Sequence, residues 1–192
     1  MKHGDSPAAG PASLDRQWWL RVPLVLRRPR AVFAALADDS PPAAEARQEP
    51  VTALVFLAGI GFVLAAGAGG RIAEEWVDDS VVIAVWAILG GGIQGLLSYF
   101  VLGGVVLGVL RSLGSRASYR QARHALAFSA APLALWLLTA WPVQLAVFGR
   151  DLFRAGGDDT GTGSTVFDAI AAGFACWWLA LLAIGVWSLR RA

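Results

Sequence analysis

The sequence predicts an all-α fold, a polytopic integral membrane helical bundle of four spans with an N-terminal interfacial amphipathic helix. The 192 residues are 56% hydrophobic and only 16% charged, with a mean hydropathy of +0.56. A soluble domain usually contains about 25% charged residues. The apolar residues form four long runs, and arginines are concentrated in alternate connections between them. This composition excludes intrinsic disorder and argues against a water-soluble enzyme, because so much apolar surface must be buried.

Each of the four apolar runs is long enough to cross a bilayer. A membrane helix needs about 20 predominantly apolar residues. The runs cover residues 51–69, 80–110, 125–149 and 165–189. We expect each to form one span, and we expect Pro132 and Pro142 to kink the third, because proline removes a helical hydrogen bond.

The second run is longer than one crossing requires. A helix over all of residues 80–110 would extend about 46 Å, against a hydrocarbon core of about 30 Å. Either one tilted helix projects into water, or the three glycines Gly90–Gly92 break it into two half-helices. Whether the helix is continuous or broken stays open from the sequence.

The charges of the connections predict the topology. The first fifty residues carry seven basic residues, the segment from Arg111 to Arg123 contains four arginines and no acid, and the sequence ends with Arg190 and Arg191. The other two connections contain more acidic than basic residues. Because cytoplasmic segments are enriched in Lys and Arg, we expect the second run to cross once. Both termini are then cytoplasmic, and the protein is a multi-pass cell-membrane protein.

The N-terminal fifty residues form a separate region. Residues 1–13 are rich in Pro, Ala and Gly and are expected to be disordered. Residues 14–50 are expected to be cytoplasmic or interfacial, with a short amphipathic helix that starts at Pro29 and places Val32, Phe33 and Leu36 on one face. Arginines beside apolar residues such as Trp18 are typical of a helix that lies on a membrane surface. Residues 51–192 then form the transmembrane bundle.

Small residues recur at four-residue spacing within the spans. Gly91 is followed by Gly95 and Gly104 by Gly108 in the second run. Such faces allow two helices to approach closely. Packing inside one bundle is the favoured interpretation, and a homo-oligomer is the alternative.

The arginine-rich connection is the main candidate for a contact surface. Ser118 and Gln121 form a capping box, which predicts a helix beginning at the cytoplasmic surface. The arginines nearby are suited to the phosphates of anionic lipid headgroups or to an acidic, unidentified protein partner. They also suffice as topology determinants alone. The candidate contact residues are Arg111, Arg116, Tyr119, Arg120 and Arg123.

Polar residues inside the runs are few. The intramembrane candidates are Gln94, Ser98, Gln144 and Asp168, and we expect Gln94 and Ser98 to hydrogen-bond to another helix. No nucleophile, base and orienting acid can be assembled from them, so no catalytic residue is predicted and the protein is not expected to be an enzyme. The single Cys176 and two histidines predict no metal site and no cofactor. Nothing beyond the arginines suggests nucleic-acid binding.

Several stretches resemble the Yip1-domain family of membrane proteins. The segment from Val25 to Phe33 is similar to the family's leucine, basic residue, proline and phenylalanine entry, and Glu49-Pro50 resembles its acidic-proline step. The segment from Leu113 to Gln121, followed by Ala127 to Pro132, resembles the glycine, aromatic and glutamine stretch before a proline-bearing helix. The resemblance covers roughly residues 20–189.

This resemblance implies a cytoplasmic N-terminal region and five membrane helices. Eukaryotic members act in vesicle trafficking and associate with Rab GTPases, whereas bacterial members mostly lack an assigned function. Lys2 is the only lysine beside fifteen arginines, which suggests a GC-rich genome and a bacterial inner membrane. Since only four runs precede Ala192, either the fifth helix is absent or the chain is shortened.

The leading functional hypothesis is a Yip1-like membrane adaptor or scaffold. Its basic cytoplasmic face, built from residues 16–36 and Arg111–Arg123, would contact a protein partner or anionic lipid. The alternative is a small transporter or transporter subunit, in which the kinked third span and the side chains of Gln94, Ser98 and Gln144 would form a polar path.

Overall fold

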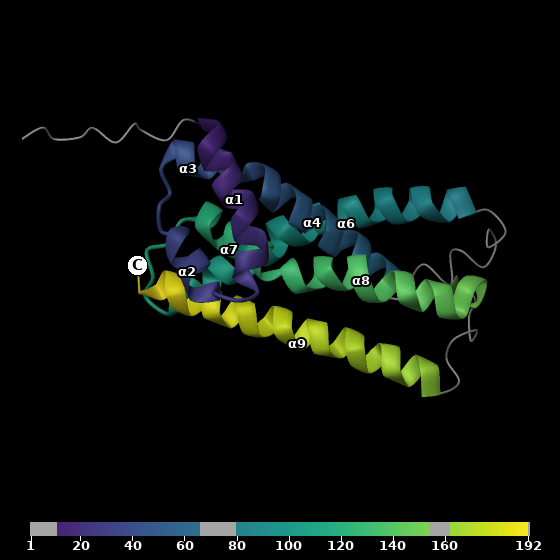
Figure 1. Cartoon of the computed structure of the whole chain (residues 1–192). Helices are drawn as coiled ribbons and strands as arrows, with labels where there is room; N and C mark the ends of the chain where they lie inside the picture. The colour runs from purple at the N-terminus through teal and green to yellow at the C-terminus, as the bar shows by residue number, and fades with distance from the viewer. Residues whose placement is uncertain (1–10, 66–79, 154–161, 192) are drawn as a thin grey trace, which may run out of the picture.

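The computed structural model describes residues 11–65, 80–153 and 162–191, and the regular elements within these ranges are helical (Figure 1). Four candidate membrane spans are long and apolar enough to cross a bilayer: Pro41–Ala65, Val82–Ser112, Tyr119–Phe148 and Thr162–Arg190. The predicted class, an all-α protein with four apolar spans, is therefore confirmed. The helices are α1 Pro11–Val25, α2 Pro29–Ala35, α3 Pro41–Ala46, α4 Gln48–Ala65, α6 Ser80–Ser112, α7 Tyr119–Ser129, α8 Ala131–Phe148, η1 Gly149–Phe153 and α9 Thr162–Arg190.

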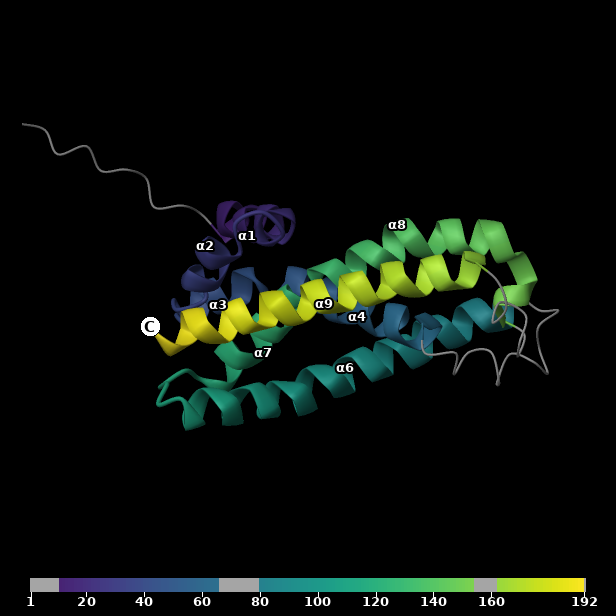
Figure 2. The same ribbon diagram turned by 90° about the horizontal axis from the view of Figure 1, so that it is seen from below.

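The long helices run side by side, and the short helices gather at one end. Helix α4 packs mainly against α6 and α8, while α9 packs against α8, α7 and α2. Figures 1 and 2 place α1, α2 and α3 at the same end as the last turn of α9. We call this end, formed by α1–α3, residues 111–118, the last turn of α9 and Arg191 after it, the basic end.

Helix α6 is continuous through the glycine triplet. It runs from Ser80 to Ser112 without a break, which agrees with a single crossing. Helix α4 lies so close that a Cβ added to Gly91 would be 2.5 Å from the Cα of Ile60. Gly95 faces the backbone of Val55 in the same way. The glycines therefore allow α4 and α6 to pack closely inside the bundle. They do not break α6 into two half-helices, the possibility that the sequence had left open.

The third candidate span is two helices. Helix α7 ends at Ser129, Ala130 caps it, and α8 begins at Ala131 with Pro132 in its first turn. Proline is favoured there because its missing N–H has no partner in a first turn. The sequence predicted a kink at Pro132; the structure instead has a helix boundary at Ala130, with Pro132 in the first turn of the next helix. Pro142 lies inside α8 without ending it.

The N-terminal region differs from its prediction in three respects. Helix α1 begins at Pro11, so residues 11–13, expected to be disordered, are helical, and residues 1–10 lie outside the described ranges. A second short helix, α3, lies in this region in addition to the one predicted from Pro29, and it has two prolines in its first turn after Ser40. The apolar face of α2, expected on the leaflet, instead packs inside the protein, because α9 covers it.

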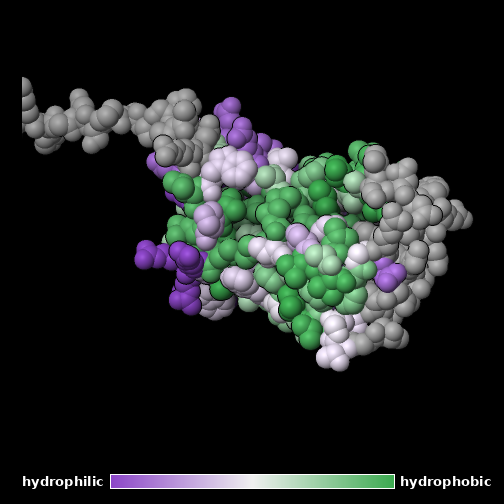
Figure 3. All heavy atoms as spheres, turned by 45° about the vertical axis from the view of Figure 1, so that its right-hand side comes forward, coloured by the Kyte–Doolittle hydropathy of each residue, from purple (hydrophilic) through white to green (hydrophobic). Residues whose placement is uncertain are grey.

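The body of the molecule is covered by apolar side chains. In Figure 3, green side chains cover the described part of the body, and purple ones gather at the basic end. Only 11% of the most apolar window of α9 is buried inside the protein. An apolar surface of this extent on a helical bundle is typical of helices surrounded by lipid.

Candidate functional site

The centre of the basic end is the carboxylate of Asp39, which lies between α2 and α3. Its Oδ1 accepts hydrogen bonds from Nε of Arg120 at 2.8 Å and from Nη2 of Arg47 at 3.0 Å. Its Oδ2 accepts a hydrogen bond from the hydroxyl of Ser118 at 2.7 Å. The guanidinium of Arg120 also donates to the backbone carbonyl of Asp39 at 2.8 Å. One carboxylate thus joins the N-terminal region to the start of α7.

Gln121 strengthens the same connection. The predicted capping box is present: the Ser118 N–H donates to Oε1 of Gln121 at 2.8 Å, and the Gln121 N–H donates to the Ser118 hydroxyl at 3.1 Å. The amide Nε2 of Gln121 then donates to the carbonyls of Leu36 at 3.2 Å and Ala37 at 3.0 Å. We call Asp39, Arg47, Ser118, Arg120 and Gln121 the Asp39 clamp. It satisfies carbonyls at the end of α2 that would otherwise lack partners.

Arg47 is the buried member of the clamp. Its side chain has 0% exposure, and its Nη1 donates to the carbonyl of Asp38 at 2.9 Å. The guanidinium lies 5.5 Å from the ring of Trp18, which packs at 5.6 Å against Phe128 of α7. Trp18 was expected at the membrane surface but is only 3% exposed. Its ring is buried because it fills the space between α1, α3 and α7.

The ionisation of Asp39 reflects this environment. Burial by itself would raise the pKa of the Asp39 carboxyl group. The hydrogen bonds from Arg120 and Ser118, together with the charges of Arg120 and Arg47, outweigh burial and hold the pKa below its ordinary value. The carboxylate is therefore charged at neutral pH and balances part of the buried positive charge.

The five predicted contact residues separate into two groups. Arg120 is held by Asp39, and Tyr119 donates its hydroxyl to the carbonyl of Phe100 at 2.7 Å. The guanidinium of Arg123 packs over the rings of Tyr99, Phe100 and Tyr119 at 5.0, 4.8 and 4.6 Å. These three candidates therefore take part in contacts within the chain. The remaining two, Arg111 and Arg116, are exposed, and Tyr119 and the side chain of Arg120 are themselves 38% and 43% exposed.

The intramembrane polar candidates do not form one path. Gln94 donates to the Ser98 hydroxyl at 3.3 Å, and both lie on α6, so the hydrogen bond expected between helices is within one helix. Both line a cavity of about 420 Å³ whose other walls come from α4, α7, α8 and α9. Gln144 is absent from that lining, and Asp168 is exposed near the start of α9. The transporter alternative gains no support from this arrangement.

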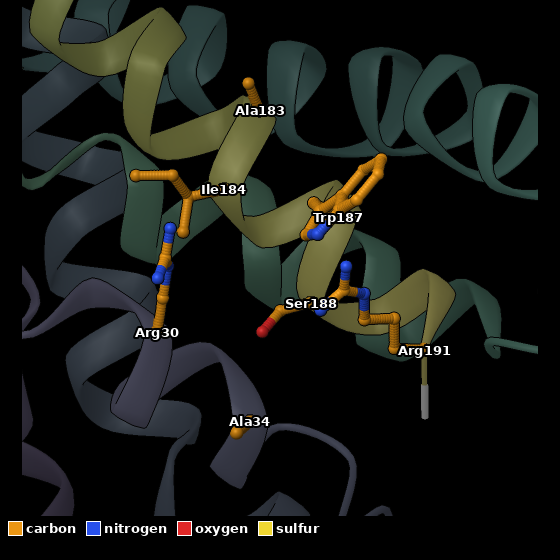
Figure 4. A pocket seen from close by; sticks show the side chains of 7 residues that line it. All are labelled: Arg30, Ala34, Ala183, Ile184, Trp187, Ser188 and Arg191. Carbon is orange, nitrogen blue, oxygen red and sulfur yellow. The ribbon is translucent and has the colours of Figure 1, made fainter.

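A second cavity lies at the basic end between α2 and α9. Its volume is about 850 Å³. Figure 4 shows Arg30 reaching from α2 toward Ile184, and Arg191 lying beside Trp187. The lining residues are Arg30, Ala34, Ala183, Ile184, Trp187, Ser188 and Arg191. Two guanidinium groups from different helices thus face a space that contains no carboxylate among its lining residues.

Within residues 11–65, 80–153 and 162–191, no group of three or more His, Cys, Asp or Glu side chains could hold a metal ion. The buried atoms without a hydrogen-bond partner include Nε of Arg47 and Nδ1 of His124. Neither Arg47 nor His124 lines a cavity described above, whereas Trp178, whose Nε1 also lacks a partner, lines the cavity that contains Gln94 and Ser98.

Sequence reasoning missed Asp39, Arg47 and the cavity between α2 and α9. The capping box was detected because its two residues are three positions apart. The partners of Asp39 on α7 are about eighty positions away, so no local pattern could reveal them. The only local signal was the pair Asp38-Asp39 between two apolar stretches, beside a lone arginine at position 47.

The fold and the basic end define an all-helical multi-pass membrane protein whose N-terminal helices are fixed to the start of its third span. The family profile described as "Yip1 domain" matches residues 24–192, and the chain belongs to the Yip1 domain family. This match includes every residue of the Asp39 clamp. Proteins of this family are generally non-enzymatic membrane proteins. Comparisons with curated proteins and with solved structures gave no match.

Proposed function

We propose that this Yip1-domain protein is a membrane adaptor that binds an acidic segment of a partner protein at its basic end, on the cytoplasmic side. The observation that carries the proposal is the Asp39 clamp. It joins α2 and α3 to α7, and α9 packs against both α2 and α7, so that arginines from three separate segments are gathered at one end of the bundle. The exposed arginines of these three segments are Arg27, Arg28, Arg30, Arg111, Arg116, Arg190 and Arg191.

Preorganisation favours binding because fewer groups need to be ordered when the partner arrives. In the clamp, the Asp39 carboxylate pairs with arginines of the same chain, whereas Arg111 and Arg116 lie on the surface. Arginine presents several N–H donors in a plane that matches a carboxylate. An acidic peptide segment is therefore the occupant that this surface suits.

The test is site-specific photocrosslinking in native membranes from Leu113, which is 40% exposed and lies between Arg111 and Arg116. Leu89 of α6, 61% exposed on the apolar body, is the matched control position. We expect a discrete protein adduct from position 113 and none of the same mass from position 89.

Charge dependence completes the test. The double variant R111Q/R116Q should reduce the adduct from position 113 several-fold, because the partner's carboxylates lose their two nearest donors. The variant R27Q/R28Q removes the same charge elsewhere on the basic end and should have a smaller effect. An unchanged adduct in R111Q/R116Q, or adducts with lipid alone, would overturn the proposal.

A further inference from the structure

We propose that the cavity between α2 and α9 is a binding site for the headgroup of an anionic phospholipid from the leaflet at the basic end. The site uses Arg30 and Arg191 of the basic end and contains neither Arg111 nor Arg116, which are the arginines proposed to bind the acidic segment. It is defined by the seven lining residues named above, and we call it the α2–α9 pocket.

Charge complementarity is the first argument. Arg30 comes from α2 and Arg191 from the end of α9, and the hydroxyl of Ser188 lies between them (Figure 4). The lining contains two positive charges and no negative charge. Guanidinium groups form charge-assisted hydrogen bonds with phosphate oxygens, and a hydroxyl supplies a further donor.

The shape of the pocket supplies the second argument. Helices α2 and α9 approach closely beside the pocket, since a Cβ added to Gly185 would lie 3.1 Å from the ring of Phe33. Ala34, Ala183 and Ile184 make the rest of the wall apolar. The pocket therefore has a charged part and an apolar part, as a lipid headgroup with its glycerol and first methylenes requires.

The apolar part continues along the outside of α9. Cys176, Leu179, Ala183 and Trp187 follow at spacings of three or four residues, which places them on one helical face. All four are exposed, Leu179 to 53% and Trp187 to 51%. Acyl chains attached to a headgroup in the pocket would lie along this face. A free phosphate would leave this face unused.

The position of the pocket along the bundle agrees with the binding of a lipid headgroup. The guanidinium groups of Arg190 and Arg191 lie 5.4 and 4.8 Å from the ring of Trp187. Tryptophan beside arginine at the end of a span is typical of the membrane–water interface. The pocket is therefore at the level where lipid phosphates are found.

The test is native mass spectrometry of the purified, delipidated full chain titrated with phosphatidylglycerol and with phosphatidylcholine of the same acyl length. We expect preferential retention of phosphatidylglycerol. The variant R30Q/R191Q should weaken that retention about tenfold or more, since each arginine near an anionic membrane surface contributes appreciably to binding. The variant R111Q/R116Q removes equal charge outside the pocket and should retain the lipid.

A second pair of variants tests the shape without changing charge. Ala183→Trp fills the pocket and should abolish the preference, whereas Ala172→Trp on an exposed part of the same helix should not. Unchanged retention in R30Q/R191Q, an equal loss in both double variants, or an unaffected Ala183→Trp would overturn the proposal. Displacement of the lipid by inorganic phosphate at similar concentration would identify a free-anion site and would overturn it too.

Discussion

At the scale of single residues, the fold depends on how the charge of Arg47 is accommodated. A fully buried guanidinium is unfavourable unless it is paired and hydrogen-bonded. Here Asp39 supplies the charge and the carbonyl of Asp38 a further acceptor. Removing one partner of a buried ion pair leaves an uncompensated charge, which is more damaging than the pair itself is favourable.

The first prediction concerns this pair. Asp39→Asn keeps the shape of the side chain but removes the charge that balances Arg47, and we expect it to lower the stability by about 3 kcal/mol. Thermal unfolding of the protein in detergent measures the effect. Asp38→Asn is the matched control, because it removes an adjacent negative charge without removing a hydrogen bond to Arg47. The Asp38 carboxylate accepts from the Ser40 N–H, and Arg47 donates to the backbone carbonyl of Asp38. Equal losses in the two variants would contradict a central role for Asp39.

The lowered pKa of Asp39 predicts a pH dependence with a definite sign. A carboxyl group with a lower pKa in the folded state contributes stability above its unfolded pKa, which is about 3.9. That contribution is lost as the pH falls through the folded-state pKa, because the clamp must then take up a proton. The difference in Tm between the wild type and Asp39→Asn should be constant from about pH 5 to 8 and shrink below about pH 4. A difference that grows on acidification would show that the sign is wrong.

At the scale of elements, contact between α4 and α6 depends on glycine. Gly59 of α4 and Gly91 and Gly95 of α6 have no side chains, so the two backbones meet directly. Without a hydrophobic effect between helices in lipid, this close van der Waals contact is a main source of association. The Gly104–Gly108 pair, which shows the same spacing, has nothing within 4 Å of an added Cβ.

The contrast between Gly91 and Gly104 allows a matched experiment within α6. Gly91→Ala forces a methyl group against Ile60, and overpacking of this kind lowers stability by about 1–3 kcal/mol. Gly104→Ala should be neutral or slightly stabilising, since alanine favours helix formation. Thermal unfolding in detergent compares the two variants. A loss at Gly104 as large as at Gly91 would mean that a second copy of the chain covers that face, as the homo-oligomer alternative requires.

The helices also show which sequence patterns are sufficient to predict an element of the structure. The four spans and the start of α7 at the capping box were predictable, because run length and local hydrogen-bonding residues determine them. Pro132 predicted a kink, where the structure has a helix boundary at Ala130. The burial of Val32 and Phe33 against α9 did not, because an amphipathic face has the same pattern whether protein or lipid covers it.

At the scale of the whole molecule, the basic segments meet at one end. Residues 111–118, α2 and the last turn of α9 are far apart in the chain, and Ser115 donates a hydrogen bond to the carbonyl of Leu189 at 3.0 Å. Four crossings bring these segments together. This arrangement suits the positive-inside rule, which predicts that the basic end faces the cytoplasm.

Sidedness can be measured with single cysteines in a Cys176→Ser background. Gln17→Cys and Arg116→Cys lie at the basic end, and Gly163→Cys lies at the start of α9; all three positions are exposed. A membrane-impermeant maleimide should label the first two from the cytoplasmic side and the third from the opposite side. Labelling of all three from one side would contradict the four-span topology.

The sequence by itself determined that this is a helical membrane protein, where its spans lie, and which connections are basic. Those properties follow from composition, run length and local spacing, which act within one or two helical turns. Tertiary structure alone decided which arginines are ion-paired within the chain. Arg120 and Arg116 differ by four positions in the same basic segment, yet one is held by Asp39 and the other is on the surface. The α2–α9 pocket arises in the same way, because charges from distant helices become neighbours only when the bundle closes.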